Sequence, residues 1–123
     1  MACDFIDELG KSPTVTKLKE VLGLQVSDWI YPTYVNGFTD DSSSWRSRYR
    51  KIGRQVEVHI NVKNGADNSI ILNLQSGFRP PFSQGAVLSS STGYKKLQIR
   101  SDGSVYLKGT VDTWINGVVL FNV

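Results

Sequence analysis

Four Asn-Gly or Asp-Gly dipeptides divide the sequence after residue 29 into short segments. They are Asn36-Gly37, Asn64-Gly65, Asp102-Gly103 and Asn116-Gly117. Such pairs accept the positive φ angles of the tight turns that join antiparallel strands. A chain interrupted so regularly has little room for long helices, so we expect this part to be built from β-strands.

The segments between the turn dipeptides are typical of strands. Residues 55–62 alternate strictly, which places Val56, Val58, Ile60 and Val62 on one face. Further strand-like runs are residues 70–74, 94–100, 105–107 and 118–123. About six to eight short strands at this spacing indicate an antiparallel β-sandwich or β-barrel.

The start of the chain has a different pattern, and we expect residues 1–28 to form a helical stem and linker before a head domain at 29–123. Ser12-Pro13 is a helix start signal and Gly23 is a plausible stop. The apolar stripe between them consists of Val15, Leu18, Val21 and Leu22. A helix of about ten residues is marginal alone in water. The stripe must therefore pack on the β-domain or on the same stripe of sister chains.

The composition excludes several classes of protein. The 123 residues carry one cysteine and one histidine, which rules out an intrachain disulfide and a site of two imidazoles. No apolar run approaches the length of a membrane span, so we expect no membrane insertion. The first ten residues carry acids where a signal peptide has lysines, and we expect synthesis in the cytoplasm without a signal peptide.

Catalytic motifs are missing from the sequence. It has no G-x-S-x-G, no P-loop and no G-x-G-x-x-G. We therefore expect no enzymatic activity, no cofactor and no metal site. Two alternatives stay open: the acids could supply the carboxylate pair of a glycan depolymerase, and Asp40-Asp41 beside Ser42–Ser44 could coordinate a hard cation.

Residues suited to saccharide binding occur in loop-like surroundings. Aromatic faces stack on the apolar side of sugar rings, while acidic and basic side chains hydrogen-bond the hydroxyls. The candidates are Asp40, Asp41, Trp45, Arg46 and Tyr94. We expect these residues to contact a saccharide.

A cluster of basic residues lies between residues 46 and 54, within a chain of net charge +3. Its simplest interpretation is a strand with charges on its solvent face. Together with the aromatics it also allows a small OB-like domain that binds nucleic acid. We favour the first interpretation and expect no nucleic-acid partner.

Several motifs occur in an order that resembles the C-terminal head or tip domains of bacteriophage tail-fibre and baseplate receptor-binding proteins. They lie in residues 34–39, 49–56, 74–81, 99–107 and 118–123. The first four contain the patterns aromatic-x-Asn-Gly-aromatic, Tyr-Arg-Lys-Ile-Gly-x-x-Val, Leu-x-x-Gly-Phe-Arg-Pro and Asp-Gly-x-Val. The resemblance covers residues 29–123.

The resemblance implies a non-catalytic, homotrimeric virion component of the phage tail tip or fibre. Its β-sandwich or β-barrel head would bind a host surface or cell-wall polysaccharide, and its other partners would be phage tail and baseplate proteins. Trimeric symmetry would strengthen weak sugar binding through avidity. The alternative is a structural tail or fibre-tip protein that acts in virion assembly without binding the receptor.

Overall fold

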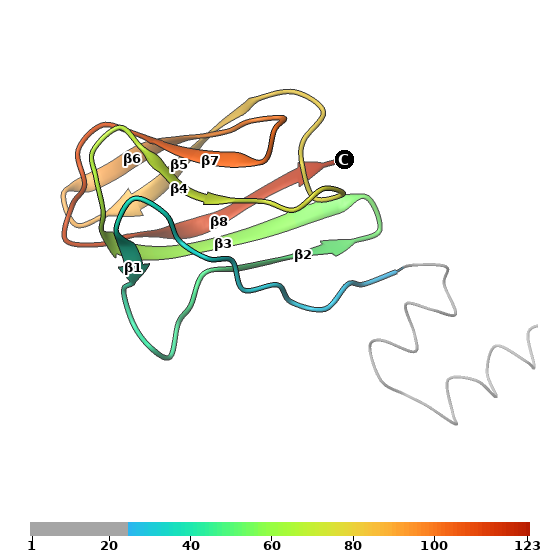
Figure 1. Ribbon diagram of the computed structural model, residues 1–123, viewed down its shortest axis with the longest axis horizontal. Coiled ribbons are helices and arrows are strands. Elements are labelled where there is room, and N and C mark those ends of the chain that lie inside the picture. The colour runs from blue at the N-terminus through green and yellow to red at the C-terminus, as the bar shows by residue number, and fades with distance from the viewer. Residues whose placement is uncertain (1–24) are drawn as a thin grey trace, which may run out of the picture.

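A computed structural model describes residues 25–123, and this part of the chain is an antiparallel sheet of eight strands without a helix (Figure 1). The strands are β1 (Phe38–Asp40), β2 (Arg48–Ile52), β3 (Gln55–Asn64), β4 (Ile70–Asn73), β5 (Gln84–Ser90), β6 (Gly93–Ile99), β7 (Ser104–Lys108) and β8 (Ile115–Asn122). The predicted antiparallel β fold is confirmed. Within residues 25–123 no helix is long and apolar enough to cross a membrane.

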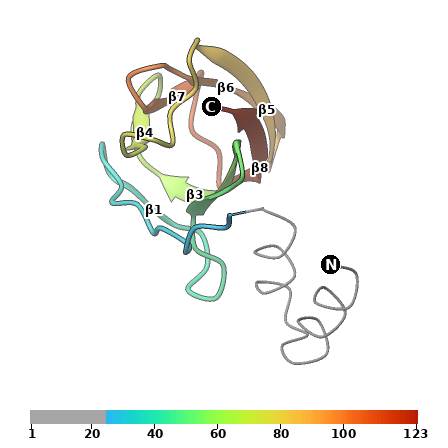
Figure 2. The same cartoon turned by 90° about the vertical axis from the view of Figure 1, so that its right-hand side faces the viewer.

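The sheet curls into a nearly closed barrel (Figure 2). The hydrogen-bonded order is β1-β3-β8-β5-β6-β7-β4, and β2 pairs with β3 beyond the end of β1. Strand β3 is the longest and pairs with β8 over eight residues. In contrast, β5 and β8 pair only at Ser89 and Ser90 of β5. The barrel wall is therefore tight at β3 and splayed between β5 and β8.

The segment before β1 closes the barrel by linking its two ends. Ile30 exchanges backbone hydrogen bonds with Tyr49 of β2, at 2.8 and 2.9 Å. Further on, Tyr34 bridges Leu72 of β4, and the Val35 N–H donates to the carbonyl of Ile71. One extended segment thus contacts both β2 and β4, which are far apart along the sheet.

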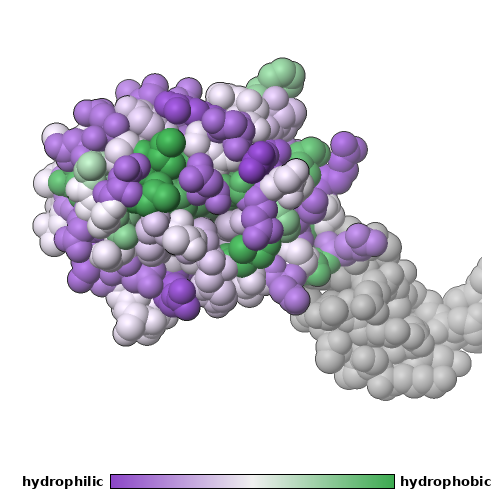
Figure 3. Space-filling model, viewed as in Figure 1, coloured by the Kyte–Doolittle hydropathy of each residue, from purple (hydrophilic) through white to green (hydrophobic). Residues whose placement is uncertain are grey.

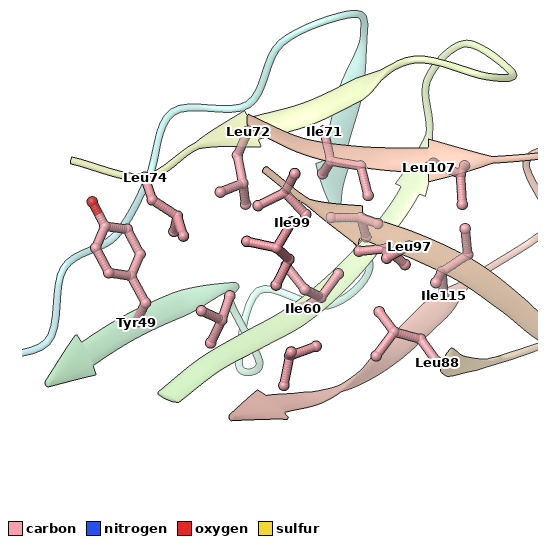
Figure 4. Packing of buried hydrophobic residues seen from close by; sticks show 14 of the residues in the cluster. Tyr49, Ile60, Ile71, Leu72, Leu74, Leu88, Leu97, Ile99, Leu107 and Ile115 are labelled. Atoms are coloured by element: carbon pink, nitrogen blue, oxygen red, sulfur yellow. The ribbon is translucent and has the colours of Figure 1, made fainter. Parts of the chain in front are cut away.

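The barrel interior is filled by apolar side chains from all eight strands, including Phe38 of β1. The largest fully buried side chains include Tyr49, Ile60, Ile71, Leu72, Leu74, Leu88, Leu97, Ile99, Leu107 and Ile115 (Figure 4). Tyr49 also has a polar role, because its hydroxyl accepts the Gln75 N–H at 3.1 Å while its ring packs edge-on against Phe78. This contact connects β2 to the loop that follows β4.

Asn36-Gly37 and Asp102-Gly103 lie in turns, as predicted, whereas Asn64-Gly65 marks the end of β3, before the loop to β4. Asn36-Gly37, Asn64-Gly65 and Gly103 have positive φ angles. The prediction was wrong for Asn116-Gly117, which lies inside β8. A Cβ on Gly117 would approach Leu88 to 2.6 Å, so the glycine makes room for a core leucine of β5 rather than for a turn.

The predicted stem helix and its stripe of Val15, Leu18, Val21 and Leu22 lie outside the described residues. The described chain begins before the predicted head boundary at 29. Ser27 donates its N–H to the Lys51 carbonyl at 2.9 Å, and Val26 bridges Ile52. Residues 26 and 27, which the sequence places in the linker, therefore pair with β2.

Candidate functional site

A shallow hollow of about 260 Å³ lies on the outside of the barrel beside the loop between β1 and β2. This loop projects away from the sheet in Figure 1. The hollow is lined by Tyr31, Ser43, Ser44, Trp45, Arg46 and Arg48. Trp45 and Tyr31 are 60% and 48% exposed, so both side chains are accessible to solvent. We call these six residues the Trp45 hollow.

Hydrogen bonds between residues close in sequence hold the loop that carries Trp45. The Trp45 N–H donates to the Ser42 carbonyl at 3.1 Å, and the hydroxyls of Ser42 and Ser44 lie 2.9 Å apart. Behind the loop, the buried Ser47 hydroxyl accepts the Asn61 N–H at 2.9 Å and donates to the Asn61 carbonyl at 3.3 Å. The loop is thereby fixed to the middle of β3, and Trp45 projects from an ordered base.

Asp40 holds Arg46 at the edge of the hollow. One carboxylate oxygen, Oδ1, accepts the Tyr34 hydroxyl at 2.5 Å, and the other, Oδ2, lies 3.4 Å from Arg46 Nε. The Arg46 guanidinium lies 4.8 Å from the centre of the Tyr31 ring, within the range of a cation–π contact. Burial and the bond to Asp40 together raise the pKa of Tyr34 to about 12. Tyr34 therefore remains a donor at neutral pH, and Asp40 has both oxygens engaged.

Trp29 stacks on two arginines of β2, one of which, Arg48, lines the hollow. The guanidinium carbons of Arg48 and Arg50 lie 3.9 and 4.2 Å from the centre of its ring. Glu57 pairs with Arg50 at 3.4 Å and with His59 at 2.7 Å, and the hydrogen bond from His59 is the main cause of the lowered pKa of Glu57. Arg48 is thus stacked on Trp29 and also lines the hollow.

The structure places the five predicted saccharide-binding residues in three groups. Trp45 and Arg46 line the hollow, and Asp40 lies behind it as the partner of Arg46. Asp41 is half-buried and contributes its N–H to the Asn61 carbonyl at 3.4 Å, without lining the hollow.

Tyr94 lies elsewhere on the barrel wall. The register runs from Asn61 of β3 to Asn116, then to Ser89 and then to Tyr94 of β6. Three steps of about 4.8 Å each separate Tyr94 from Asn61. Tyr94 is 65% exposed there and does not contribute to the Trp45 hollow.

Four residues of the hollow are not among the predicted saccharide-binding residues: Tyr31, Ser43, Ser44 and Arg48. Tyr31 and Arg48 meet because the backbone of Ile30 pairs with that of Tyr49 in an antiparallel bridge. The residues next to this bridge, Tyr31 and Arg48, therefore lie opposite each other on the outer face of β2. The sequence contains weak signals for both. Pro32 holds Tyr31 in an extended conformation, and Arg48 lies one position before the buried Tyr49, so that it points outward.

The hollow offers aromatic faces together with N–H and O–H donors. On the face shown in Figure 3 the surface of the barrel is mainly hydrophilic, and the apolar side chains form small separate patches. Within residues 25–123 no three His, Cys, Asp or Glu side chains gather in a way that could hold a metal ion. The arrangement suits a polar ligand with an apolar face.

Comparison of the sequence with families of known proteins and with curated proteins gives no match.

Proposed function

We propose that the barrel is the receptor-binding head of a bacteriophage tail-fibre or baseplate protein and that it binds a saccharide of the host surface without cleaving it. The observation that carries this proposal is the exposed Trp45 beside Arg46, over a fixed loop and next to a second exposed aromatic ring, Tyr31. In this proposal the chain is a virion component that works as a homotrimer alongside other tail proteins.

The chemistry of the Trp45 hollow supports a sugar as the ligand. The C–H face of a pyranose is apolar and packs on an aromatic ring, here Trp45 or Tyr31. Its hydroxyls accept hydrogen bonds from guanidinium groups, here Arg46 and Arg48, and charged donors form the stronger bonds. Because Asp40 and Trp29 hold these arginines in place, binding requires little further ordering of their side chains.

A shallow hollow gives weak affinity per site, which suits an adhesion protein. Symmetric copies that engage one polysaccharide together multiply the affinity through a high effective concentration. A homotrimer would supply three such hollows.

The test is binding of the full chain to an array of bacterial cell-wall and capsular oligosaccharides, followed by titration of the best ligand into variants. Trp45→Ala should weaken binding about tenfold or more, because aromatic contacts contribute roughly 1 kcal/mol beyond their buried area. Phe82→Ala is the matched control, since Phe82 is a 78% exposed aromatic outside the hollow. A blank array with oligomeric protein, or equal losses in both variants, would overturn the proposal.

One observation favours the second candidate, a structural protein of the tail tip. Val118 and Leu120 on the outer face of β8 are 51% and 54% exposed and lie in register with His59 and Glu57. Two adjacent aliphatic side chains of this kind suit a protein contact. Replacing both with Ser would then impair incorporation into virions while leaving saccharide binding intact, whereas Trp45→Ala would leave incorporation intact.

A further inference from the structure

A second hollow, of about 470 Å³, lies on the outer wall formed by β5, β6 and the end of β7. It is lined by Ser83, Gln84, Gly85, Ala86, Val87, Lys96, Leu97, Gln98 and Lys108. Strands β3 and β8 separate this wall from the Trp45 hollow in the sheet order. Its volume falls in the range of about 300–1,000 Å³ that ligand pockets occupy.

The hollow exists because small residues on β5 face long ones on β6. Gly85 pairs with Gln98, and a Cβ on Gly85 would have only the Leu97 carbonyl, at 3.9 Å, within contact distance. The next outward position of β5 is Val87, which pairs with Lys96 and is 63% exposed. The missing side chain at 85 therefore opens a depression between Val87 and Gln98.

Two lysines stand side by side at this depression. Lys96 and Lys108 are exposed Cα partners across β6 and β7. Like charges directly opposite each other on a sheet destabilise it. Among the residues from 25 onward, the ion pairs of the structure involve Arg46, Arg50, His59 and Lys95, and none involves Lys96 or Lys108. A bound anion would relieve the repulsion between the two ammonium groups.

The amide of Gln98 is oriented to add a third donor. Arg100 lies with its guanidinium 4.5 Å from the centre of the Tyr106 ring, and its Nε–H donates to Gln98 Oε1 at 3.1 Å. With the oxygen occupied, the free group of this amide is its NH₂. The hollow thus combines two ammonium groups with an amide donor, and its lining contains no carboxylate.

We infer that this hollow, which we call the Lys96 hollow, binds the acidic group of a charged saccharide. The ammonium groups and the Gln98 amide match a carboxylate, sulfate or phosphate group, and the exposed Val87 offers an apolar contact for a sugar ring. The lining contains no aromatic side chain on which bases could stack, which favours a saccharide over a single-stranded nucleic acid. The inference does not depend on ligand binding at the Trp45 hollow.

The test is a titration of the isotope-labelled full chain followed by amide chemical shifts. The probes are a galacturonic acid trisaccharide, a neutral galactose trisaccharide, inorganic sulfate and an oligothymidylate. The acidic trisaccharide should change the amide chemical shifts of residues 84–87 and 96–98. Raising the salt concentration should weaken its binding. Binding of the neutral trisaccharide to these residues with equal strength, or no shift with the acidic one, would overturn the inference.

The remaining probes separate the possible sources of the anionic group. Sulfate alone should bind more weakly than the acidic trisaccharide, because it lacks the ring that contacts Val87. Equal binding by sulfate would reduce the hollow to a simple anion site and overturn the saccharide assignment. Stronger binding by the oligothymidylate would overturn it in favour of a nucleic acid.

Variants locate the binding and separate it from general charge effects. Lys96→Gln combined with Lys108→Gln should weaken the acidic trisaccharide by at least about tenfold, since a charged hydrogen bond is worth roughly that factor. Arg54→Gln combined with Lys63→Gln removes the same charge from the β3 side of the barrel and should change the affinity by less than about twofold. Equal losses in both pairs would overturn the inference.

The variant Trp45→Ala tests whether binding at the Lys96 hollow is independent of the site in the proposed function. It should leave binding of the acidic trisaccharide at the Lys96 hollow unchanged while it weakens binding of the ligand found on the array. A loss of the acidic trisaccharide in Trp45→Ala would place that ligand at the other hollow and overturn the inference.

Discussion

The hydroxyl of Tyr34 donates a hydrogen bond of 2.5 Å to Oδ1 of Asp40 and accepts the N–H of Ser47 at 3.3 Å. The backbone of Tyr34 also bridges Leu72 of β4, so one residue contacts β4 through its main chain and the loop that carries Trp45 through its side chain. The other carboxylate oxygen of Asp40, Oδ2, pairs with Arg46. The Trp45 hollow and the closure of the barrel are therefore connected through one residue, Tyr34.

Tyr34→Phe should destabilise the barrel by about 1–2 kcal/mol, because the change removes a hydrogen bond to a charged, half-buried carboxylate. Urea denaturation of the wild type and the variant measures the difference. Tyr31→Phe is the matched control, since Tyr31 is a 48% exposed tyrosine and should change stability by less than about 0.5 kcal/mol. Equal stability of Tyr34→Phe and the wild type would show that the bond does not tie the loop to the barrel.

Tyr34→Phe should also lose less stability at high pH than the wild type does. The pKa of Tyr34 is raised from 10.0 to about 12, so the folded chain keeps a proton that the unfolded chain loses. Its contribution is fully present below pH 10 and is lost as the pH rises towards 12. Because the side chain is only half-buried, solvent screening limits the loss to roughly 1 kcal/mol. The difference in unfolding free energy between wild type and Tyr34→Phe, measured from neutral to alkaline pH, should shrink over this interval.

Glu57→Gln should have its largest effect near neutral pH and a small effect in acid. The His59 hydrogen bond, with the charge of Arg50, lowers the pKa of Glu57 below its usual 4.5. A lowered folded pKa stabilises the protein above that value, and the gain is lost as the pH falls through the folded pKa. We expect a difference of about 1 kcal/mol near neutrality that shrinks below pH 4.5, measured by thermal or urea unfolding. A difference that grows in acid would contradict this assignment.

Gly103→Ala should destabilise the barrel far more than Gly53→Ala. Both glycines have positive φ angles, +93° and +59°, so both variants carry backbone strain of about 1 kcal/mol or more. A Cβ on Gly103 would also lie 2.5 Å from the Leu74 carbonyl and 2.6 Å from Arg79 Nε, whereas Gly53 has nothing within 4 Å. We expect a loss of roughly 2–4 kcal/mol for Gly103→Ala, from strain plus overpacking. Urea midpoints compare the two, and equal losses would contradict the crowding.

Strands can be predicted from the sequence where apolar and polar residues alternate because one face is buried. They cannot be predicted where the extended conformation depends only on hydrogen bonding to a neighbouring strand. In β3 the inward residues Val56, Val58 and Ile60 are fully buried, so the pattern is direct. In β5 the run Gln84–Ser90 contains a glycine and two serines. Its extended form depends on pairing with β6, which no local pattern reports.

The Trp45 hollow was predictable only as far as its residues are neighbours in sequence. Trp45 and Arg46 are adjacent, and their composition indicates an exposed loop. Tyr31 and Arg48 join them through the pairing of Ile30 with Tyr49, a tertiary contact. Tyr94 is also an aromatic residue in a loop-like stretch of sequence, but it lies three strands away along the wall from Asn61. Residue type alone does not indicate which strands pair, so the sequence could not separate Tyr94 from the hollow.

Arg46→Lys should weaken saccharide binding about tenfold while leaving stability within about 0.5 kcal/mol of the wild type. Lysine keeps the charge near Asp40, but it lacks the planar group that lies 4.8 Å from the centre of the Tyr31 ring and the fork of donors that a sugar can use. Arg54→Lys, at the exposed turn between β2 and β3, is the matched control and should bind as the wild type does. Titration of the array ligand and urea unfolding of each variant measure both effects. If Arg46→Lys binds as tightly as the wild type, the guanidinium contributes only its charge, and the aromatic rings alone hold the sugar.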